Sequence, residues 1–167
     1  MGVAEDIKRI SEQERRLVFE TFDEATAFAL GSLVRDRALR DKLGIVIDIR
    51  AWDRPLFYAA MPGSTGSNAD WARRKVNTVR MFLKSTYRLG LEQGREDKTF
   101  PPGHGLAPSE FVLAGGGFPI AVKGAGVVGV IAISGLPQRQ DHELVVAVLS
   151  EKLGLDYETL ALPRVES

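Results

Sequence analysis

The sequence predicts one α/β domain of the α+β type, built from a strand, two β-hairpins and three main helices. Two observations support this fold class. Short runs of β-branched and aromatic residues come in adjacent pairs, and stretches with helical periodicity separate them. The chain has 167 residues, of which 44% are hydrophobic, so it can form one hydrophobic core. We expect a single domain over residues 1–167, with an N-terminal helical arm over 1–13 and a core over about 16–155.

The first half of the chain predicts two helices, a strand and a hairpin. Residues 3–13 are rich in helix formers, and alternating apolar residues over 15–21 predict a short strand. Asp23 is the expected N-cap of a helix that ends at Gly44, where a left-handed residue is needed. Two apolar runs within residues 44–61 then predict the first hairpin.

The second half predicts a long helix, an irregular loop and a final helix. Asn68 is the expected N-cap of a helix over about 69–91. Residues 95–108 contain three prolines and two glycines without periodicity, which indicates a surface loop. The last helix should open near Asp141 and end near Gly154.

Residues 114–135, AGGGFPIAVKGAGVVGVIAISG, contain the pattern G-x-G-x-x-G at Gly124, Gly126 and Gly129. A dinucleotide site needs a helix directly after these glycines, because the helix N-terminus holds the pyrophosphate. The β-branched run VVGVIAIS follows instead, so we predict a hairpin that turns at the first two glycines. The third marks close approach by another backbone, a helix or a ligand. Residues 115–117 face either a ligand or a neighbouring helix, and both interpretations stay open.

The overall charge argues against several classes of partner. Twenty-two basic residues balance 22 acidic ones, so no global field attracts nucleic acid or an anionic membrane. The chain has no cysteine, which excludes disulfides and thiolate metal sites and is typical of a reducing compartment. It also shows no secretory signal pattern and no apolar run long enough to span a bilayer. We therefore expect a cytoplasmic protein.

A first candidate site lies where the loop PGSTGSN enters the long helix. Hydroxyl groups and backbone N–H groups gather at the helix N-terminus, and Arg74 and Lys75 follow within two turns. Trp71 shares a helix face with Lys75, so an aromatic ring and a cation could contact one acidic ligand. The alternative is an ordinary capped helix whose arginines pair with acidic side chains or with a second subunit.

Three further titratable residues are candidates. His104 lies in a glycine-flanked loop and is a possible metal ligand, or an exposed histidine without a function. His142, at the start of a helix, is expected to be neutral and hydrogen bonded, since the helix N-terminus disfavours the charged ring. Asp48 lies in an apolar strand and shares a face with Arg50. We interpret them as an ion pair, with a catalytic acid as the alternative.

Several motifs occur together in a fixed order. They are IVIDIR, STGSNADWARRKVNTV, GGGFPI and GVVGVIAISGLPQRQDHELVV. In these elements the chain, from about residue 22 to 153, resembles the haem-degrading-domain family of GlcG/HbpS-like proteins. It is most similar to a branch that carries the Trp-x-Arg-Arg-Lys helix and the Asp-His-Glu ending.

The resemblance implies an antiparallel sheet of about five strands flanked by helices, assembled into symmetric homo-oligomers. It implies haem or a related tetrapyrrole as the ligand, bound between the long helix and the glycine-lined sheet. With His104 as the metal ligand, the expected cofactor-binding residues are His104, Trp71, Arg74, Lys75, Gly116, Gly117 and Phe118. Two alternatives stay open: a non-catalytic adaptor or chaperone-like interaction protein, and an accessory enzyme of glycolate or diol metabolism.

Overall fold

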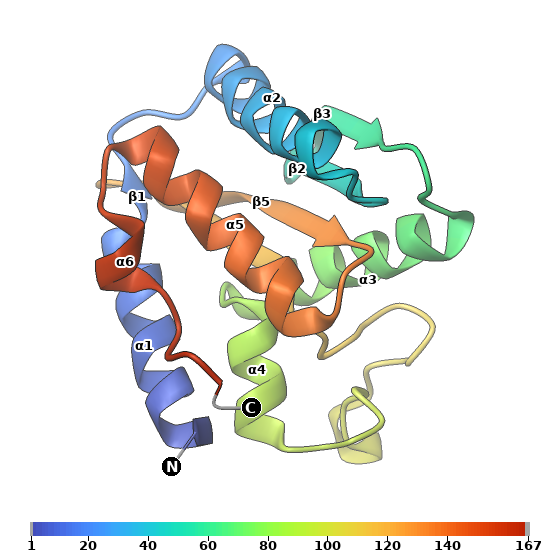
Figure 1. Cartoon of the computed structure of the whole chain (residues 1–167). Coiled ribbons are helices and arrows are strands. Elements are labelled where there is room, and N and C mark those ends of the chain that lie inside the picture. Colours follow the sequence, from blue (N-terminus) through green and yellow to red (C-terminus); the bar gives the residue numbers. More distant parts are fainter. Residues whose placement is uncertain (1, 166–167) are drawn as a thin grey trace.

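A five-stranded sheet forms the centre of the molecule, and helices cover both of its faces (Figure 1). The computed structural model describes residues 2–165. The strands are β1 (Val18–Phe19), β2 (Val46–Ala51), β3 (Arg54–Ala60), β4 (Gly117–Val122) and β5 (Gly126–Ser134). They lie in the order β1-β4-β5-β2-β3 across the sheet. The prediction of an α/β fold with about five strands is confirmed.

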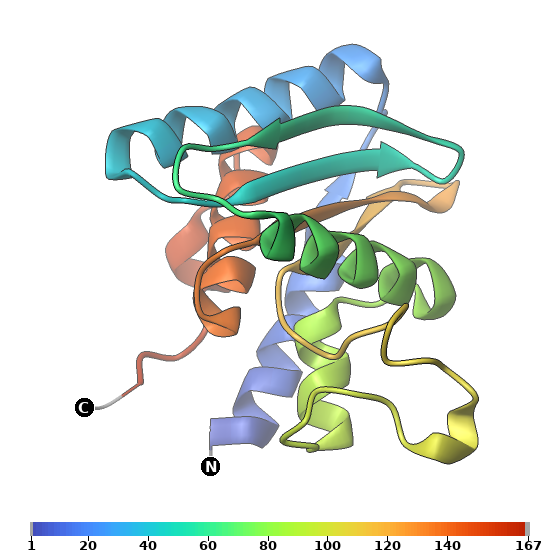
Figure 2. The same ribbon diagram turned by 90° about the vertical axis from the view of Figure 1, so that its right-hand side faces the viewer.

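The helices are α1 (Gly2–Arg16), α2 (Glu24–Asp41), α3 (Gly66–Phe82), α4 (Thr86–Gln93), α5 (Gln138–Leu153) and α6 (Tyr157–Leu160). The larger apolar core fills the space between α2, α5 and one sheet face, and includes Ile47, Ile49 and Ile131. Helix α3 covers the opposite face of the sheet (Figure 2). A smaller core lies between them and includes Val46 and Val130, which alternate along their strands with residues of the larger core.

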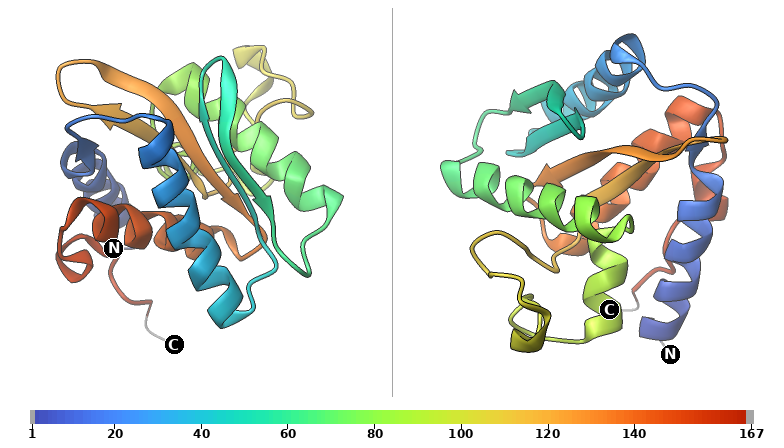
Figure 3. Two further views of the ribbon diagram at one scale, coloured as in Figure 1. Left: turned by 90° about the horizontal axis from the view of Figure 1, so that it is seen from above. Right: turned by 180° about the vertical axis from the view of Figure 1, so that it is seen from behind.

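The sheet is mixed, so the prediction of a purely antiparallel sheet was wrong at one edge. β1 pairs with β4 in parallel, with Val18 opposite Ala121. The two hairpins lie side by side in the rest of the sheet (Figure 3). The other strand pairs are antiparallel. Hairpin turns force antiparallel pairing, but β1 reaches β4 through a long intervening chain that leaves its direction free. Only the assembled core therefore decides this orientation.

The hairpin over residues 114–135 is confirmed. Gly124 and Gly126 form its turn, each with φ of +80°, and β5 follows directly instead of a helix. A Cβ atom at Gly129 would overlap the carbonyl oxygen of Arg50 on β2. The close approach at this glycine is therefore made by a backbone, and a strand follows the glycine pattern as predicted.

Two helix termini differ from the sequence prediction. The N-cap Asp23 is confirmed, since its Oδ1 accepts from the Thr26 N–H at 2.8 Å. The left-handed C-cap of α2 is Lys42, not Gly44. Gly44 serves a different purpose, because a Cβ there would lie 2.9 Å from the Gly63 carbonyl carbon. At α3 the N-cap is Thr65, and Asn68 completes a capping box with it.

The helix predicted over residues 69–91 is two helices. Leu83 adopts a left-handed conformation with φ of +58°, which ends α3. Ser85 Oγ then caps α4 by accepting the Arg88 N–H at 3.4 Å, and Gly94 is the left-handed C-cap that ends α4. A leucine in the left-handed conformation has no strong sequence signal. The hydrophobic periodicity therefore predicted one continuous helix across this position. The last helix also begins earlier than predicted, after Pro137, and ends at Gly154 as expected.

The N-terminal helix is packed against the rest of the fold and does not project as an arm. Ile10 is fully buried, and Gln13 donates its Nε2 N–H to the carbonyl oxygen of Leu160 at 2.8 Å. Asp6 pairs with Arg139 of α5 at 2.6 Å. Among residues 2–165, no helix combines the length and apolar character needed to cross a membrane.

Candidate functional site

A pocket of about 220 Å³ lies between the N-terminal halves of α3 and α5, beside the end of β5. Trp71 and Lys75 line it from α3, and Lys98 and Ala114 line it from the segment before β4. The opposite side is formed by Asn68 and by the stretch that leads into α5, namely Ser134, Gly135, Leu136, Pro137, Gln138 and Asp141. Two of the predicted site residues, Trp71 and Lys75, therefore meet in one pocket.

A buried ion pair forms part of the pocket wall. Lys75 Nζ donates to Asp141 Oδ2 at 3.2 Å and to the Ile133 carbonyl oxygen at 2.9 Å. The two side chains are only 3% and 2% exposed. Burial raises the pKa of Asp141 to about 6, and the Lys75 ammonium opposes this shift. Burial likewise lowers the pKa of Lys75, which Asp141 opposes. Each group thus favours the charged form of the other.

The rest of the pocket wall is cationic and aromatic. Lys98 makes no ion pair within the described chain, so its ammonium adds positive charge to the pocket. Arg74 stacks over the Trp71 ring at 4.2 Å but does not itself line the pocket. The N-terminus of α5 has no side-chain cap, which leaves the positive end of its dipole at this site.

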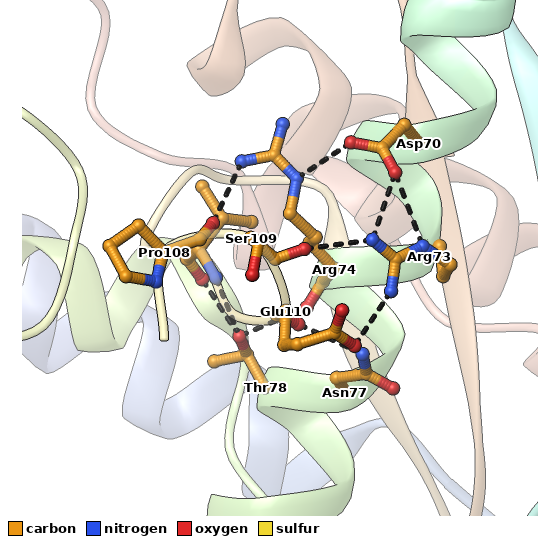
Figure 4. A network of polar contacts seen from close by, with 9 residues as sticks. Asp70, Arg73, Arg74, Asn77, Thr78, Pro108, Ser109 and Glu110 are labelled. Atoms are coloured by element: carbon orange, nitrogen blue, oxygen red, sulfur yellow. Dashed lines mark hydrogen bonds and ion pairs between the residues drawn. The ribbon is translucent and has the colours of Figure 1, made fainter. Parts of the chain in front are cut away.

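The arginines of α3 hold the loop in front of the helix (Figure 4). Arg73 pairs with Asp70 at 2.9 Å and with Glu110 at 2.8 Å. Arg74 pairs with Asp70 at 3.1 Å and donates to the carbonyl oxygen of Pro108 at 3.4 Å. The interpretation of these arginines as partners of nearby acidic residues is therefore confirmed.

The three consecutive glycines pack against helices. Gly115 N–H donates to Gln138 Oε1 at 3.1 Å, and Gly117 N–H donates to Thr86 Oγ1 at 2.9 Å. A Cβ at Gly116 would overlap the Ile133 carbonyl oxygen. Phe118 is buried in the larger core. The structure thus places Gly116, Gly117 and Phe118 behind the pocket wall, where none of them lines the pocket.

The predicted metal ligand lies away from this pocket. His104 is exposed in a short 3₁₀ helix (Pro102–His104), with its ring 5.8 Å from that of Phe100. No histidine lines the pocket, and the described residues contain no group of three or more potential metal ligands. An iron-ligated haem does not fit the pocket for this reason. A carboxylate group fits it, because ammonium groups and a helix N-terminus face the space.

His142 is buried and neutral, as the sequence predicted. Its Nε2 lies 2.8 Å from Gln13 Oε1, while Nδ1 has no partner among the described residues. Burial, with a smaller contribution from Arg139, lowers its pKa to about 3. The residue is therefore part of the core and cannot reach a ligand.

The neutral His142 should make the fold acid-sensitive. Its folded pKa lies below the unfolded value of about 6.5, so the unfolded chain binds the extra proton. The free energy of unfolding should be unaffected by this group above pH 6.5 and fall as the pH drops from 6.5 toward 3, by at most about 1.4 kcal/mol per pH unit. Urea denaturation at several pH values between 7.5 and 4.5 measures this dependence. In His142→Leu the free energy of unfolding should fall less steeply with decreasing pH than in the parent. An equal slope in both proteins would contradict the assignment.

The ion pair predicted on β2 is also present. Arg50 Nε donates to Asp48 Oδ1 at 3.1 Å on the sheet face that carries α3. Burial raises the pKa of Asp48, and Arg50 opposes the rise.

Sequence reasoning missed the partners of Lys75 in the pocket. Asp141 was interpreted as a helix start, and Lys98 as part of an irregular loop. Asp141 lies 66 positions from Lys75, and no local pattern links the two. The only usable signal was the stretch SGLP before α5, which ends in a proline and marks a helix N-terminus without a side-chain cap.

The fold and the pocket together define a class: an α/β protein with a mixed five-stranded sheet and a small cationic pocket beside it. Residues 22–150 match the family model described as Haem degrading protein HbpS-like. The chain is 61% identical over 162 residues to the UPF0303 protein mlr5144 of Mesorhizobium japonicum, covering 97% of each chain. It is 55% identical to the UPF0303 protein BMEA_A1459 of Brucella melitensis, covering 94% of this chain and 93% of that one. The chain belongs to the HbpS-like family and, within it, to the UPF0303 proteins.

Solved structures share the fold. The Ybr137w protein superposes with a TM-score of 0.82 at 25% identity, covering 91% of this chain and 92% of its own. HbpS gives a TM-score of 0.62 at 19% identity, with 80% and 90% covered. The PduOC:Heme complex gives 0.64 at 19% identity, with 80% and 94% covered. The fold is therefore that of a group that includes a haem complex.

Proposed function

We propose that the protein binds a small acidic molecule in the pocket between α3 and α5, with a ligand carboxylate directed at Lys75 and Lys98. The observation that carries this proposal is a lysine ammonium that forms part of a pocket wall while its side chain is only 3% exposed. Two ammonium groups face one carboxylate, that of Asp141, among the lining residues. The pocket therefore has an excess of positive charge for an anion to neutralise.

We further propose a tetrapyrrole as the ligand class, held through a propionate group and not through iron. A neighbour of this fold has a haem complex, and propionates are carboxylates of the size that this pocket accepts. A volume of about 220 Å³ is too small for the macrocycle, which would stay outside the pocket. Because His104 does not line the pocket, a ligand bound there would be held without an iron ligand from the loop.

The test compares hemin with metal-free protoporphyrin IX, which has the same propionates. In a Trp52→Phe background, Trp71 is the only tryptophan and reports on the pocket. We expect saturable quenching of Trp71, with dissociation constants for the two porphyrins within a few-fold of each other. Lys98→Gln should weaken both about 10-fold, because a charged hydrogen bond is lost.

Two control variants locate the effect. Lys123→Gln removes the same charge from an exposed turn residue and should change nothing. His104→Ala should also bind as the parent does. A flat titration with both porphyrins at micromolar protein would contradict the proposal. If hemin binds but protoporphyrin IX does not, and His104→Ala abolishes the binding of hemin, then His104 ligates the iron. This result would contradict the pocket assignment.

We also propose that the protein assembles into a symmetric homo-oligomer in the cytoplasm. β3 is an edge strand, and neighbouring aromatic side chains are exposed, Phe28 by 65% and Tyr58 by 51%. Light scattering on the same samples should give a multiple of the 18.3 kDa chain mass. A monomer at the working concentration would contradict this part of the proposal.

A further inference from the structure

A second pocket, of about 280 Å³, lies between α3 and strands β2 and β3. Asp48 and Arg50 of β2, Tyr58 of β3, and Arg73, Asn77 and Arg80 of α3 line it with polar groups. None of these residues lines the pocket between α3 and α5. The ligand binding proposed above makes no use of them.

Asp48 fixes the orientation of Arg50 in this pocket. The aspartate is 3% exposed, and its Oδ1 accepts the Nε N–H of Arg50 at 3.1 Å. The ion pair uses Nε of Arg50. The two terminal nitrogens of its guanidinium make no bond to the described protein. A guanidinium held in this way presents its terminal N–H groups as a fork, which matches the two oxygens of a carboxylate or a phosphate.

Arg80 supplies charge that the protein does not balance. Its Nη2 donates to the Trp52 carbonyl oxygen at 3.1 Å, and its guanidinium lies 5.7 Å from the Trp52 ring centroid. No acidic side chain pairs with it among residues 2–165. Arg73, in contrast, is paired with Asp70 and Glu110. The pocket therefore has one uncompensated positive charge next to the fork of Arg50.

A purely structural role explains the ion pair less well. The face that carries Asp48 is otherwise an apolar cluster that includes Val46, Val76 and Val130. An apolar pair at these positions would be as stable or more stable, because burying charges costs desolvation energy. The position of the arginine fork at a pocket gives the buried carboxylate a use that packing does not.

We propose that this second pocket binds a compact oxyanion, a carboxylate or a phosphate, through Arg50 and Arg80. Asp48 is a positioning residue, because it acts only through the orientation of Arg50. The site is separate from the pocket between α3 and α5, so either site can bind its ligand without the other.

The two tryptophans separate the two sites in an experiment. Trp71 lines the first pocket, while Trp52 contacts Arg80 of the second. In the Trp71→Phe variant of the full chain, inorganic phosphate and succinate are titrated separately, with sodium chloride at matched ionic strength as the control. We expect a saturable change in Trp52 fluorescence with at least one of the two anions and none with chloride. The anion with the lower dissociation constant shows whether the pocket prefers a phosphate or a carboxylate.

Arg50→Gln and Arg80→Gln should each weaken this binding about 10-fold or more, since each removes charged hydrogen bonds. Arg80 lies on the surface, so its removal does not threaten folding, and calorimetry replaces fluorescence for that variant because Trp52 loses its neighbour. Arg50→Lys should not restore binding, because an ammonium lacks the fork. Asp48→Asn should weaken anion binding without abolishing it, because Arg80 is still present to bind the anion.

The control is Arg35→Gln, which removes an exposed arginine from α2 on the opposite sheet face. It should show the same change in Trp52 fluorescence with the anion as the parent does. Binding that persists unchanged in both Arg50→Gln and Arg80→Gln would overturn the proposal. A titration with phosphate and succinate that does not differ from chloride would overturn it as well. Neither result would affect the porphyrin experiment.

Discussion

Replacing Asp141 with Ala is expected to lower the free energy of unfolding by about 3–5 kcal/mol. The substitution leaves the Lys75 ammonium buried, with the Ile133 carbonyl oxygen as its remaining partner. It also removes the acceptor of the Leu136 N–H, which Asp141 Oδ1 provides at 3.1 Å. For a domain of this size the loss corresponds to a fall of about 6–20 °C in the melting temperature. Urea denaturation at pH 8, above the pKa of Asp141, measures it.

An exposed ion pair provides the matched control. Asp36 pairs with Arg35 at 3.4 Å, and their side chains are 69% and 52% exposed. Asp36→Ala should change stability by no more than about 0.5 kcal/mol, because water solvates the arginine that remains. The double variant Lys75→Met with Asp141→Leu should recover most of the loss, since no unpaired charge is left in the core. If Asp141→Ala costs no more than Asp36→Ala, the pair is not buried as described.

Replacing Gly116 with Ala should be the second large effect, a loss of about 2–5 kcal/mol. The glycine has φ of +129°, a conformation that side chains disfavour. Its added Cβ would overlap the Ile133 carbonyl oxygen and lie 2.7 Å from Lys75 Nζ. Relief of the overlap would require movement of β5 or of the buried lysine. Thermal and urea denaturation should both show the loss.

Gly126→Ala separates conformational strain from steric overlap. Gly126 also has a positive φ, of +80°, but no atom lies within 4 Å of its added Cβ. We expect a loss of about 1–2 kcal/mol, which reflects the left-handed backbone alone. Equal losses for the two variants would show that Gly116 has free space around it, which contradicts the packing described here.

Much of the fold was predictable because the signals are local. Hydrophobic periodicity identified α1, α2, α5 and both hairpins, while it joined α3 and α4 into one helix. The glycine turn at residues 124 and 126 follows from residues that lie close together in the chain. The Asp23 cap and the Asp48–Arg50 pair involve residues two or three positions apart. Such interactions depend on the geometry of one helix turn or one strand, which the sequence specifies directly.

The candidate site was predictable in part. Trp71 and Lys75 were recognised because both lie on the first turns of one helix. The sequence also placed His104 and Gly116 at the same site. The chain path separates these residues: His104 lies outside the pocket, and Gly116 lies behind its wall.

The sequence by itself determined α1, α2, α5 and both hairpins, and it placed His142 at the start of a helix. Only the tertiary structure decided that β1 runs parallel to β4, that Leu83 divides one predicted helix, and that Lys75 meets Asp141. The physical reason is the same in each case. These features depend on contacts between segments far apart in the chain, whose energies exist only after the sheet and its helices have packed together.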